Sequence, residues 1–517
     1  MSVATIGSAH IVGLQAEKVT VEVDVGNGLY SFSIVGLPDK AIDESKDRIV
    51  AALKNIGANN PKKENHKVLV SLSPADTKKE GSHFDVPIAL AYLSASKGLT
   101  LPKDIGWFVG ELSLTGDILP MKGALIVAEY AKKRGAKSLY VPYDNRKEAA
   151  LVDGINIYGC KTLSDIILHL GGTLENDARV VDITKETVTT IVHQPPSTLL
   201  DWKDIKGQAT AKRALEIAAA GGHNIALYGP PGTGKTMLAR AFTGILPPLT
   251  HEEALEVTRI HSLSNQDQTI ITHPPLRSPH HTSSHVSLVG GGTHPRPGEV
   301  TLAHRGVLFL DEFPEFEKRV IESLREPLEE GSITVSRAKG SCTFPASCTL
   351  IASMNPCPCG YMGSKQKRCV CKPSDIDRYA RKLSGPIMDR IDMWVPVLHV
   401  DYETLSQESL EEGSNVIRKR VEEGRAFAKK RFQSKGDTLT KNKDMTSKDI
   451  TKHVPLDKGS LLLMQTLATS YTLSPRAYHR VLRLARTIAD HRQGEHVSEV
   501  DILEAFQYRP KLYQDRL

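Results

Sequence analysis

The sequence predicts two consecutive units that each combine strands and helices, followed by a mainly helical region. Residues 1 to about 172 alternate β-rich runs with runs of helical period, and a second alternation extends from about residue 205 to residue 400. Beyond residue 400 the apolar period is mostly that of helices. Such alternation is typical of α/β and α+β domains, so we expect both classes in this chain.

The composition is that of a globular protein with a sizeable core. The 517 residues are 40% hydrophobic and 24% charged, with a formal net charge of +6 that is compatible with nucleic acid binding but does not demonstrate it. No apolar run approaches the roughly 18 residues of a membrane span, and the first residues lack the basic and apolar parts of a secretory signal. We expect a cytoplasmic protein that binds no membrane.

The first unit, residues 1–175, contains three strand-like and three helix-like runs. The polar stretch 176–203 includes Pro195 and Pro196 and predicts a linker. The strand-like runs span 19–25, 30–35 and 67–72, and the helix-like runs span 42–56, 86–96 and 124–134.

A glycine-rich segment predicts a phosphate-binding loop. Its sequence, GPPGTGKT, fits the pattern G-x-x-x-x-G-K-[ST] and joins a predicted strand at 224–228 to a predicted helix at 237–246. Backbone N–H groups of such a loop surround phosphates, and the helix N-terminus adds partial positive charge. We expect Lys235 to neutralise the β- and γ-phosphates of ATP, and the Thr236 hydroxyl to bind Mg²⁺. The candidate nucleotide-binding residues are Gly229, Pro230, Pro231, Gly232, Thr233, Gly234, Lys235 and Thr236.

Polar residues follow two further predicted strands. The apolar run 307–310 ends in Asp311 and Glu312. After a phosphate loop, this pattern predicts that Asp311 lies on the Mg²⁺ side and that Glu312 polarises the attacking water. The run 349–353 is followed by Asn355, whose amide can orient the same water.

These motifs occur in the order found in AAA+ ATPases, and their flanks resemble the magnesium-chelatase-like branch. With the N-terminal unit, nearly the whole chain resembles YifB/ComM-type proteins. The resemblance implies an α/β P-loop AAA+ core at 204–400, an α-helical lid at 401–517, and an α+β Lon-protease-like (ribosomal S5-like) domain at 1–175. The flanking segments that carry it are SPHHT (278–282), VGGG (289–292), RPGEVTLAHRG (296–306), LSGPIMDRID (383–392) and SPRAYHRVLRLARTIA (474–489).

The resemblance also implies a ring of six identical subunits that uses ATP and Mg²⁺. In this branch the arginine at position 390 is supplied to the neighbouring subunit's ATP as an arginine finger, and Arg476 matches the second sensor of the lid. An arginine finger stabilises charge on the transferred phosphoryl group and is worth about 10³–10⁵ in rate in other NTPases.

Two loops of the branch face the central pore, and they are candidates for contact with DNA. The insertion corresponds to residues 278–299 and the hairpin to residues 331–344 of this chain. Arg337 and Lys339 near the hairpin turn would line the pore with charge suited to a phosphate backbone. His280 and His281 in the insertion could touch DNA, bind a metal or cap a loop, and the sequence favours none of these.

Four cysteines are crowded into a short segment after Asn355. Four thiolates can bind one Zn²⁺ tetrahedrally, and the alternative is four reduced cysteines without metal. The two C-x-C pairs of this candidate zinc knuckle, residues 357–371, are Cys357 with Cys359 and Cys369 with Cys371. Between the pairs, the candidate DNA contacts are Lys365, Lys367 and Arg368.

The segment GELSLTGDILP at 110–120 is similar to the proteolytic domain of Lon, which uses a Ser–Lys dyad. This chain departs from that pattern at both positions. Leu125 stands where Lon has its lysine, and His83 is in register with the serine, with Ser82 one position early. We expect a Lon-like domain without the dyad, which packs on the ring, binds DNA or recruits a protein partner.

Several functions are compatible with these patterns. The resemblance and the basic loops favour an ATP-driven DNA motor, with helicase or branch-migration activity in recombination or DNA uptake. A remodeller of protein complexes would share the ATP chemistry and differ in what enters the pore. A metal-insertion motor of the magnesium-chelatase type would not be expected to carry the Lon-like unit or the four cysteines. A protease would need a reactive serine near Ser82.

Overall fold

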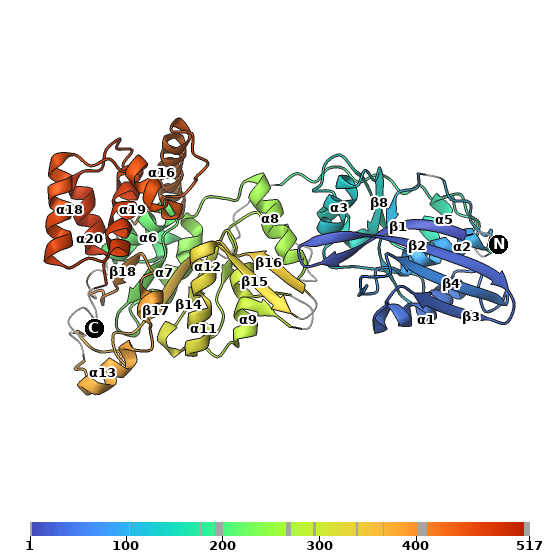
Figure 1. Cartoon of the computed structure of the whole chain (residues 1–517), viewed down its shortest axis with the longest axis horizontal. Coiled ribbons are helices and arrows are strands. Elements are labelled where there is room, and N and C mark those ends of the chain that lie inside the picture. The colour runs from blue at the N-terminus through green and yellow to red at the C-terminus, as the bar shows by residue number, and fades with distance from the viewer. Residues whose placement is uncertain are drawn as a thin grey trace. The chain divides into compact units, whose positions relative to one another are not determined.

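The structure is a computed structural model, and it divides the chain into two compact units (Figure 1). The first unit comprises residues 1–192 and 255–270, and the second comprises residues 193–254 and 271–517. Among the described residues, no helix is long and apolar enough to cross a lipid bilayer. The described residues are 3–102, 104–175, 177–191, 200–264, 270–292, 296–337, 340–364, 367–401, 403 and 411–510.

The first unit is built on a seven-stranded mixed sheet. Its strands are β1 (Val3–Val12), β2 (Gln15–Asn27), β3 (Ser31–Val35), β4 (His66–Ser73), β5 (Trp107–Phe108), β8 (Ser138–Pro142) and β9 (Asn156–Cys160), with a separate pair β6 (Glu111–Leu112) and β7 (Ile118–Leu119). The order is β3-β4-β2-β1-β5-β8-β9, in which β1–β2 and β2–β4 are antiparallel and the other pairs are parallel. The predicted strands of this unit are confirmed.

Helices cover both faces of this sheet. Alternate residues of a strand point to opposite faces, so one strand contributes side chains to two cores. Ile6 of β1 belongs to one apolar core and Ala9 to another. The first core includes residues of α1 and α2, and the second includes residues of α3. The predicted helices are therefore confirmed as the layers of an α+β domain. The helices are α1 (Lys40–Asn55), α2 (Asp85–Ala95), α3 (Ala124–Lys133), α4 (Arg146–Ala149) and α5 (Leu163–His169).

The described part of the predicted linker, residues 177–191, pairs with the edge of the first unit's sheet. Lys185 forms an antiparallel bridge with Tyr158 of β9. The backbone N–H of Glu186 donates to the carbonyl of Ile157 at 2.8 Å. The segment is rich in Val, Ile and Thr, which favour extended pairing. The polar composition of this segment predicts a linker, but composition alone does not reveal that the segment pairs with a strand.

The second unit contains a five-stranded parallel sheet whose order is β11-β14-β17-β10-β18. Its three central strands lie side by side, so their carboxyl ends meet at one edge. That edge carries the glycine-rich loop, Asp311 and Asn355. The strands are β10 (Ile225–Tyr228), β11 (Leu276–Arg277), β14 (Val307–Leu310), β17 (Thr349–Met354) and β18 (Met393–Pro396).

Smaller elements connect these strands. The predicted hairpin at 331–344 is confirmed as an antiparallel pair. The hairpin strands are β12 (Gly290–Gly291) with β13 (Arg296–Pro297), and β15 (Ser332–Arg337) with β16 (Gly340–Pro345). The helices are α6 (Ala209–Gly221), α7 (Lys235–Ile245), α8 (His251–Ser262), α9 (His285–Val289), α10 (Glu299–Leu302), α11 (Lys318–Ser323), α12 (Arg325–Glu330), α13 (Pro373–Ala380) and α14 (Gly385–Met388).

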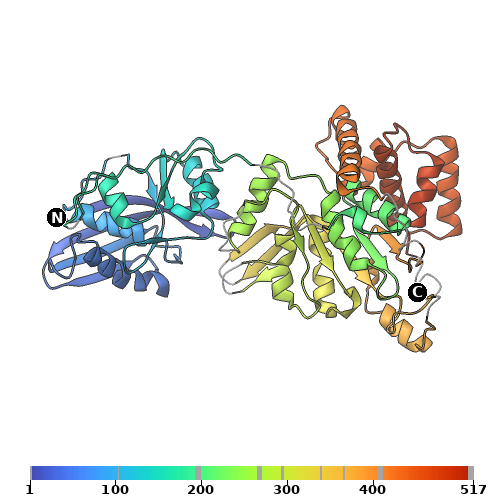
Figure 2. The same ribbon diagram turned by 180° about the vertical axis from the view of Figure 1, so that it is seen from behind.

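The C-terminal region is helical and shares one apolar core with the parallel sheet. That core includes Ile225 and Phe242 from the sheet region and Leu484 and Phe506 from the helices. Figure 2 shows the red C-terminal helices grouped beside α16. The helices are α16 (Ser414–Ser434), α17 (Ser447–His453), α18 (Lys458–Ser470), α19 (Pro475–His491) and α20 (Glu499–Gln507).

Candidate nucleotide-binding site

The glycine-rich loop leaves β10 at Tyr228 and ends at Lys235, the first residue of α7. Glycine is required at Gly229, because a Cβ there would lie 2.0 Å from the carbonyl oxygen of Val397. Gly232 and Gly234 have φ values of 77° and 88°, which residues with a side chain rarely adopt. The predicted strand–loop–helix is therefore confirmed, and the N-terminus of α7 points its unpaired N–H groups into the loop.

Lys235 lies inside the loop with only 8% of its surface exposed. Its Nζ donates to the carbonyls of Gly229 and Pro230, each at 2.8 Å, and to Oδ1 of Asn355 at 3.3 Å. Burial lowers the pKa of Lys235 to about 8, against an opposing effect of Asp311. The structure thus brings together the predicted lysine and the predicted polar residue that follows β17.

Asp311 follows β14 and accepts hydrogen bonds from three directions. The Thr236 hydroxyl donates to its Oδ2 at 2.9 Å, and the backbone N–H of Glu312 donates to its Oδ1 at 3.0 Å. The hydroxyl of Ser353 also donates to Oδ1. The two predicted Mg²⁺ ligands are therefore in direct contact. Ser353 was missed by the sequence prediction, although a serine near the end of the buried strand β17 was an available signal.

Glu312 has a left-handed backbone conformation, with φ of 53°. Its side chain is 56% exposed, and Oε2 lies 3.1 Å from Nδ1 of His281. The centroids of the His280 and His281 rings are 4.2 Å apart. Both histidines belong to the predicted insertion. The structure gives His281 a partner that the sequence did not suggest, namely the carboxylate predicted to polarise water.

Arg390 is held by groups outside the glycine-rich loop. It donates to the carbonyls of Arg325 at 3.2 Å and Pro386 at 2.7 Å, and it forms an ion pair with Glu329. Burial lowers its pKa, and the charges of Arg325 and Arg476 lower it further. Arg476 is exposed in the first turn of α19. The structure thus places the two predicted arginines within electrostatic reach of each other.

Arg480, one turn after Arg476, joins α19 to the segment that carries Arg390. Its guanidinium donates to the carbonyl of Asp389 at 3.0 Å and to that of Ile391 at 3.2 Å. A shift of α19 would therefore act on both neighbours of Arg390. The sequence prediction missed Arg480, because several arginines in this helix share the same local pattern.

The four clustered cysteines converge. The ligand atoms of Cys357, Cys359, Cys369 and Cys371 all lie within 4.8 Å of one another. The Sγ atoms of Cys357 and Cys359 are 3.5 Å apart, and Sγ of Cys369 is 3.7 Å and 3.6 Å from them. The backbone N–H of Cys359 donates to Sγ of Cys371 at 3.4 Å. Two C-x-C pairs thus form one sulfur cluster.

The predicted DNA-contact residues are only partly described by the structure. Arg337 ends β15, whereas Lys339 and Lys365 lie outside the described residues. The Nζ of Lys367 lies 4.7 Å from the centroid of the Tyr361 ring, and Arg368 is exposed. These placements leave Arg368 available to a partner at the surface of the cysteine loop.

In the first unit, the residues near the expected serine and lysine positions have separate partners. The Ser82 hydroxyl donates to Glu111, and Nζ of Lys122 donates to the carbonyl of Ser264 at 3.2 Å. Leu125 is buried in α3. His83 is half-buried, and desolvation lowers its pKa to about 4. No Ser–Lys contact is formed among these described residues.

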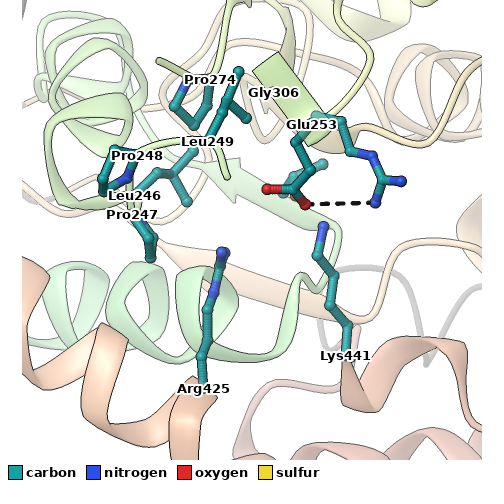
Figure 3. Close-up of a pocket in the computed structure, with 11 residues that line it drawn as sticks. Leu246, Pro247, Pro248, Leu249, Glu253, Pro274, Gly306, Arg425 and Lys441 are labelled. Atoms are coloured by element: carbon teal, nitrogen blue, oxygen red, sulfur yellow. Dashed lines mark ion pairs between the residues drawn. The ribbon is translucent and has the colours of Figure 1, made fainter. Parts of the chain in front are cut away.

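A separate small cavity lies near the opposite edge of the parallel sheet, where β14 and β17 begin. Glu253 forms an ion pair with Arg305 there at 3.6 Å. Figure 3 shows Arg425 and Lys441 extending toward Glu253. Burial and the neighbouring cations lower the pKa of Lys441 to about 7. This cavity does not include any residue of the glycine-rich loop.

Comparison with known proteins identifies relatives over nearly the whole length of the chain. The chain is 40% identical over 518 residues to competence protein ComM of Haemophilus influenzae, covering 98% of each protein. It is 39% identical to YifB of Salmonella typhimurium, covering 98% of this chain and 97% of that protein. The chain belongs to the ComM/YifB family of magnesium-chelatase-like proteins. Rv2897c of Mycobacterium tuberculosis is also similar, with 38% identity over 95% of each protein.

Three family models match consecutive segments of this chain. They are "Subunit ChlI of Mg-chelatase" at residues 21–145, "Magnesium chelatase, subunit ChlI" at 201–405, and "Magnesium chelatase, subunit ChlI C-terminal" at 411–509. The second match contains the whole glycine-rich loop, Asp311, Glu312 and Asn355. The resemblance expected from the sequence motifs is confirmed, and a parallel sheet with a helical C-terminal region is compatible with an AAA+ core and lid.

Proposed function

We propose that this protein is a cytoplasmic, ring-forming ATPase that uses ATP hydrolysis to move DNA. Its activity would be that of a helicase or branch-migration motor in recombination or DNA uptake. The observation that carries the ATPase assignment is the contact between Thr236 and Asp311 beside the buried Lys235. A lysine, a hydroxyl and a carboxylate in this arrangement match the requirements of ATP with Mg²⁺.

Each residue of the site has a role in this proposal. Lys235 and the N–H groups of the loop bind the β- and γ-phosphates, and Thr236 and Asp311 hold Mg²⁺. When bound, Mg²⁺ neutralises charge on the phosphates. Glu312 takes the proton of the attacking water, and Asn355 orients that water from the end of β17. The 3.3 Å contact between Asn355 and Lys235 supports this shared position.

Two arginines complete the site in a ring of six identical subunits. Arg390 would enter the ATP site of the neighbouring subunit and stabilise the charge of the transferred phosphoryl group. Arg476 would respond to the nucleotide from the lid. Their mutual electrostatic influence and the Arg480 contacts support a common movement of α19 and Arg390.

The DNA assignment is supported by the name of the relative ComM, a competence protein, and by the confirmed hairpin. The residues proposed to contact DNA are Arg337 and Lys339 of the hairpin and Lys365, Lys367 and Arg368 of the cysteine loop. Repetition of such cations around a ring would follow a phosphate backbone. The second candidate is a remodeller of protein complexes, which the ATP site supports equally well, and a metal-insertion motor is third.

We also infer that the four cysteines hold a structural Zn²⁺. Zinc–thiolate bonds of about 2.3 Å place the sulfurs of a tetrahedron about 3.8 Å apart. The Sγ–Sγ separations among Cys357, Cys359 and Cys369, 3.5–3.7 Å, are close to that edge length, and all four sulfurs lie within 4.8 Å of one another. The residues present therefore fit a tetrahedral zinc site.

The test is a branch-migration assay on a labelled four-way junction with ATP and Mg²⁺. We expect the wild-type protein to convert the junction and Lys235→Ala to be inactive. The exposed Lys203 provides a matched control, and Lys203→Ala should retain activity. A wild-type protein that hydrolyses ATP but moves no junction or duplex would favour the remodeller.

A further inference from the structure

The sulfur cluster lies directly against the nucleotide-binding site of the same chain. Cys357 is completely buried and is only two residues from Asn355, whose amide accepts from Lys235. Gly360, within the cysteine loop, approaches Pro231 of the glycine-rich loop. The chain therefore reaches the cluster from a residue of the ATP site and then touches the phosphate loop itself.

The contact with Pro231 depends on the absence of a side chain at Gly360. A Cβ there would lie 2.8 Å from Cδ of Pro231 and 3.7 Å from Cγ of Asn355. The φ of Gly360 is 84°, in the region that glycine favours. The backbone of the cysteine loop thus packs closely on the phosphate loop, with no flexible side chain between them.

The end of β17 makes a second connection to the phosphate loop. The backbone N–H of Gly229 donates to the carbonyl of Met354 at 3.2 Å, one residue before Asn355. The phosphate loop is therefore supported by Met354, Asn355 and Gly360, which all lie within a few residues of the cysteines. Whatever fixes the cysteine loop also restricts these three contacts.

A metal ion is the group that would fix this loop. The sulfurs of Cys369 and Cys371 lie beside those of Cys357 and Cys359, and backbone N–H groups donate to the sulfurs of Cys357 and Cys371. Four metal bonds would close the loop between the two C-x-C pairs and hold its two ends together. Metal binding of this kind contributes directly to the stability of the bound conformation.

We propose that the zinc-bound cysteine cluster is a support for the phosphate loop, so that zinc and nucleotide bind cooperatively. This inference rests on the proposed ATP site and assigns it a structural regulator. Because coupling between two sites is reciprocal, zinc strengthens nucleotide binding and nucleotide slows zinc loss. Loss or oxidation of the cysteines would weaken ATP binding while leaving every residue that contacts the nucleotide unchanged.

The experiment compares the full-length protein with Cys369→Ser and Cys371→Ser, which alter the pair more distant in sequence from Asn355. Zinc is measured by mass spectrometry, and affinity is measured with a fluorescent ATP analogue. We expect wild-type protein to contain zinc, and both variants to lose it and bind nucleotide about tenfold more weakly. Cys342→Ser, outside the cluster, is the control and should keep both properties.

Two further measurements separate the coupling from a general loss of folding. Gly360→Ala keeps all four cysteines, so it should retain zinc and still weaken nucleotide binding. In wild-type protein, saturating nucleotide should slow the transfer of zinc to a chelating dye severalfold. Variants that lose zinc but bind nucleotide normally would overturn the coupling and leave the proposed function intact. A rate of zinc loss that nucleotide does not alter would do the same. Wild-type protein that binds no nucleotide would overturn the proposed function as well.

Discussion

The imidazole of His281 lies 3.1 Å from the carboxylate of Glu312. His281 belongs to the segment between β11 and α9, whereas Glu312 follows β14 beside Asp311, the proposed Mg²⁺ ligand. A partner that displaces this segment must therefore change the surroundings of the proposed catalytic carboxylate. This contact offers a direct physical route from a bound polymer to the rate of ATP hydrolysis.

Changing His281→Ala should raise basal ATP hydrolysis severalfold and reduce any further stimulation by DNA. The reason is that the Glu312 carboxylate loses a partner that competes with the attacking water for its oxygen. Steady-state phosphate release, with and without DNA, measures both effects. His280→Ala is the matched control, because its ring contacts His281 rather than Glu312. Equal basal rates in wild type and His281→Ala would show that the contact does not restrain Glu312.

Changing Glu312→Gln should leave ATP binding intact and slow hydrolysis by about 100-fold or more, the effect of losing a general base. The amide keeps the size of the side chain but cannot take a proton from water. Binding of a fluorescent ATP analogue and single-turnover hydrolysis separate the two steps. Hydrolysis at the wild-type rate would assign the base to another residue.

Changing Arg390→Ala should reduce hydrolysis by about 10³-fold while nucleotide binding persists, if the residue acts on the neighbouring subunit's ATP. Mixing this variant with Lys235→Ala protein creates interfaces in which an intact Arg390 faces an intact Lys235. Partial recovery of activity in the mixture is expected. Mixtures that remain inactive at every ratio, although hetero-oligomers form, would contradict a role in trans.

Lys441 should make the stability of the second unit depend on pH. Its pKa is lowered to about 7 in the fold by burial and by Lys443 and Arg425, whereas an unfolded lysine titrates near 10.4. The unfolded state therefore binds more protons between these values, and stability rises with pH in that window. The destabilisation caused by burying the protonated Lys441 amine is fully present below pH 7.

Replacing Lys441→Met should consequently raise the melting temperature at pH 7 by several degrees and by less at pH 10. Thermal unfolding followed by circular dichroism across this range measures the difference. Lys430→Met, at an exposed position of α16, is the control and should be nearly neutral. An effect of Lys441→Met that is the same at both pH values would contradict the burial of a charged amine.

Local patterns were sufficient for the elements that carry the ATP site. The loop from Tyr228 to Lys235, the strand before Asp311 and the strand before Asn355 are each encoded by adjacent residues, so the sequence predicted them. The Glu312–His281 and Gly360–Pro231 contacts join residues that are distant in the chain. Only tertiary packing creates them, and no local period or composition indicates which of several histidines or glycines is involved.

The proposed function couples ATP hydrolysis to a DNA phosphate backbone. It is tested by the steady-state ATPase rate with single-stranded, double-stranded and four-way-junction DNA across salt concentrations. We predict stimulation by at least one form, with an effect that weakens as salt rises because phosphate contacts release counterions. An intact basal ATPase that no form of DNA alters at any salt concentration would contradict the proposed DNA motor and point to a protein substrate.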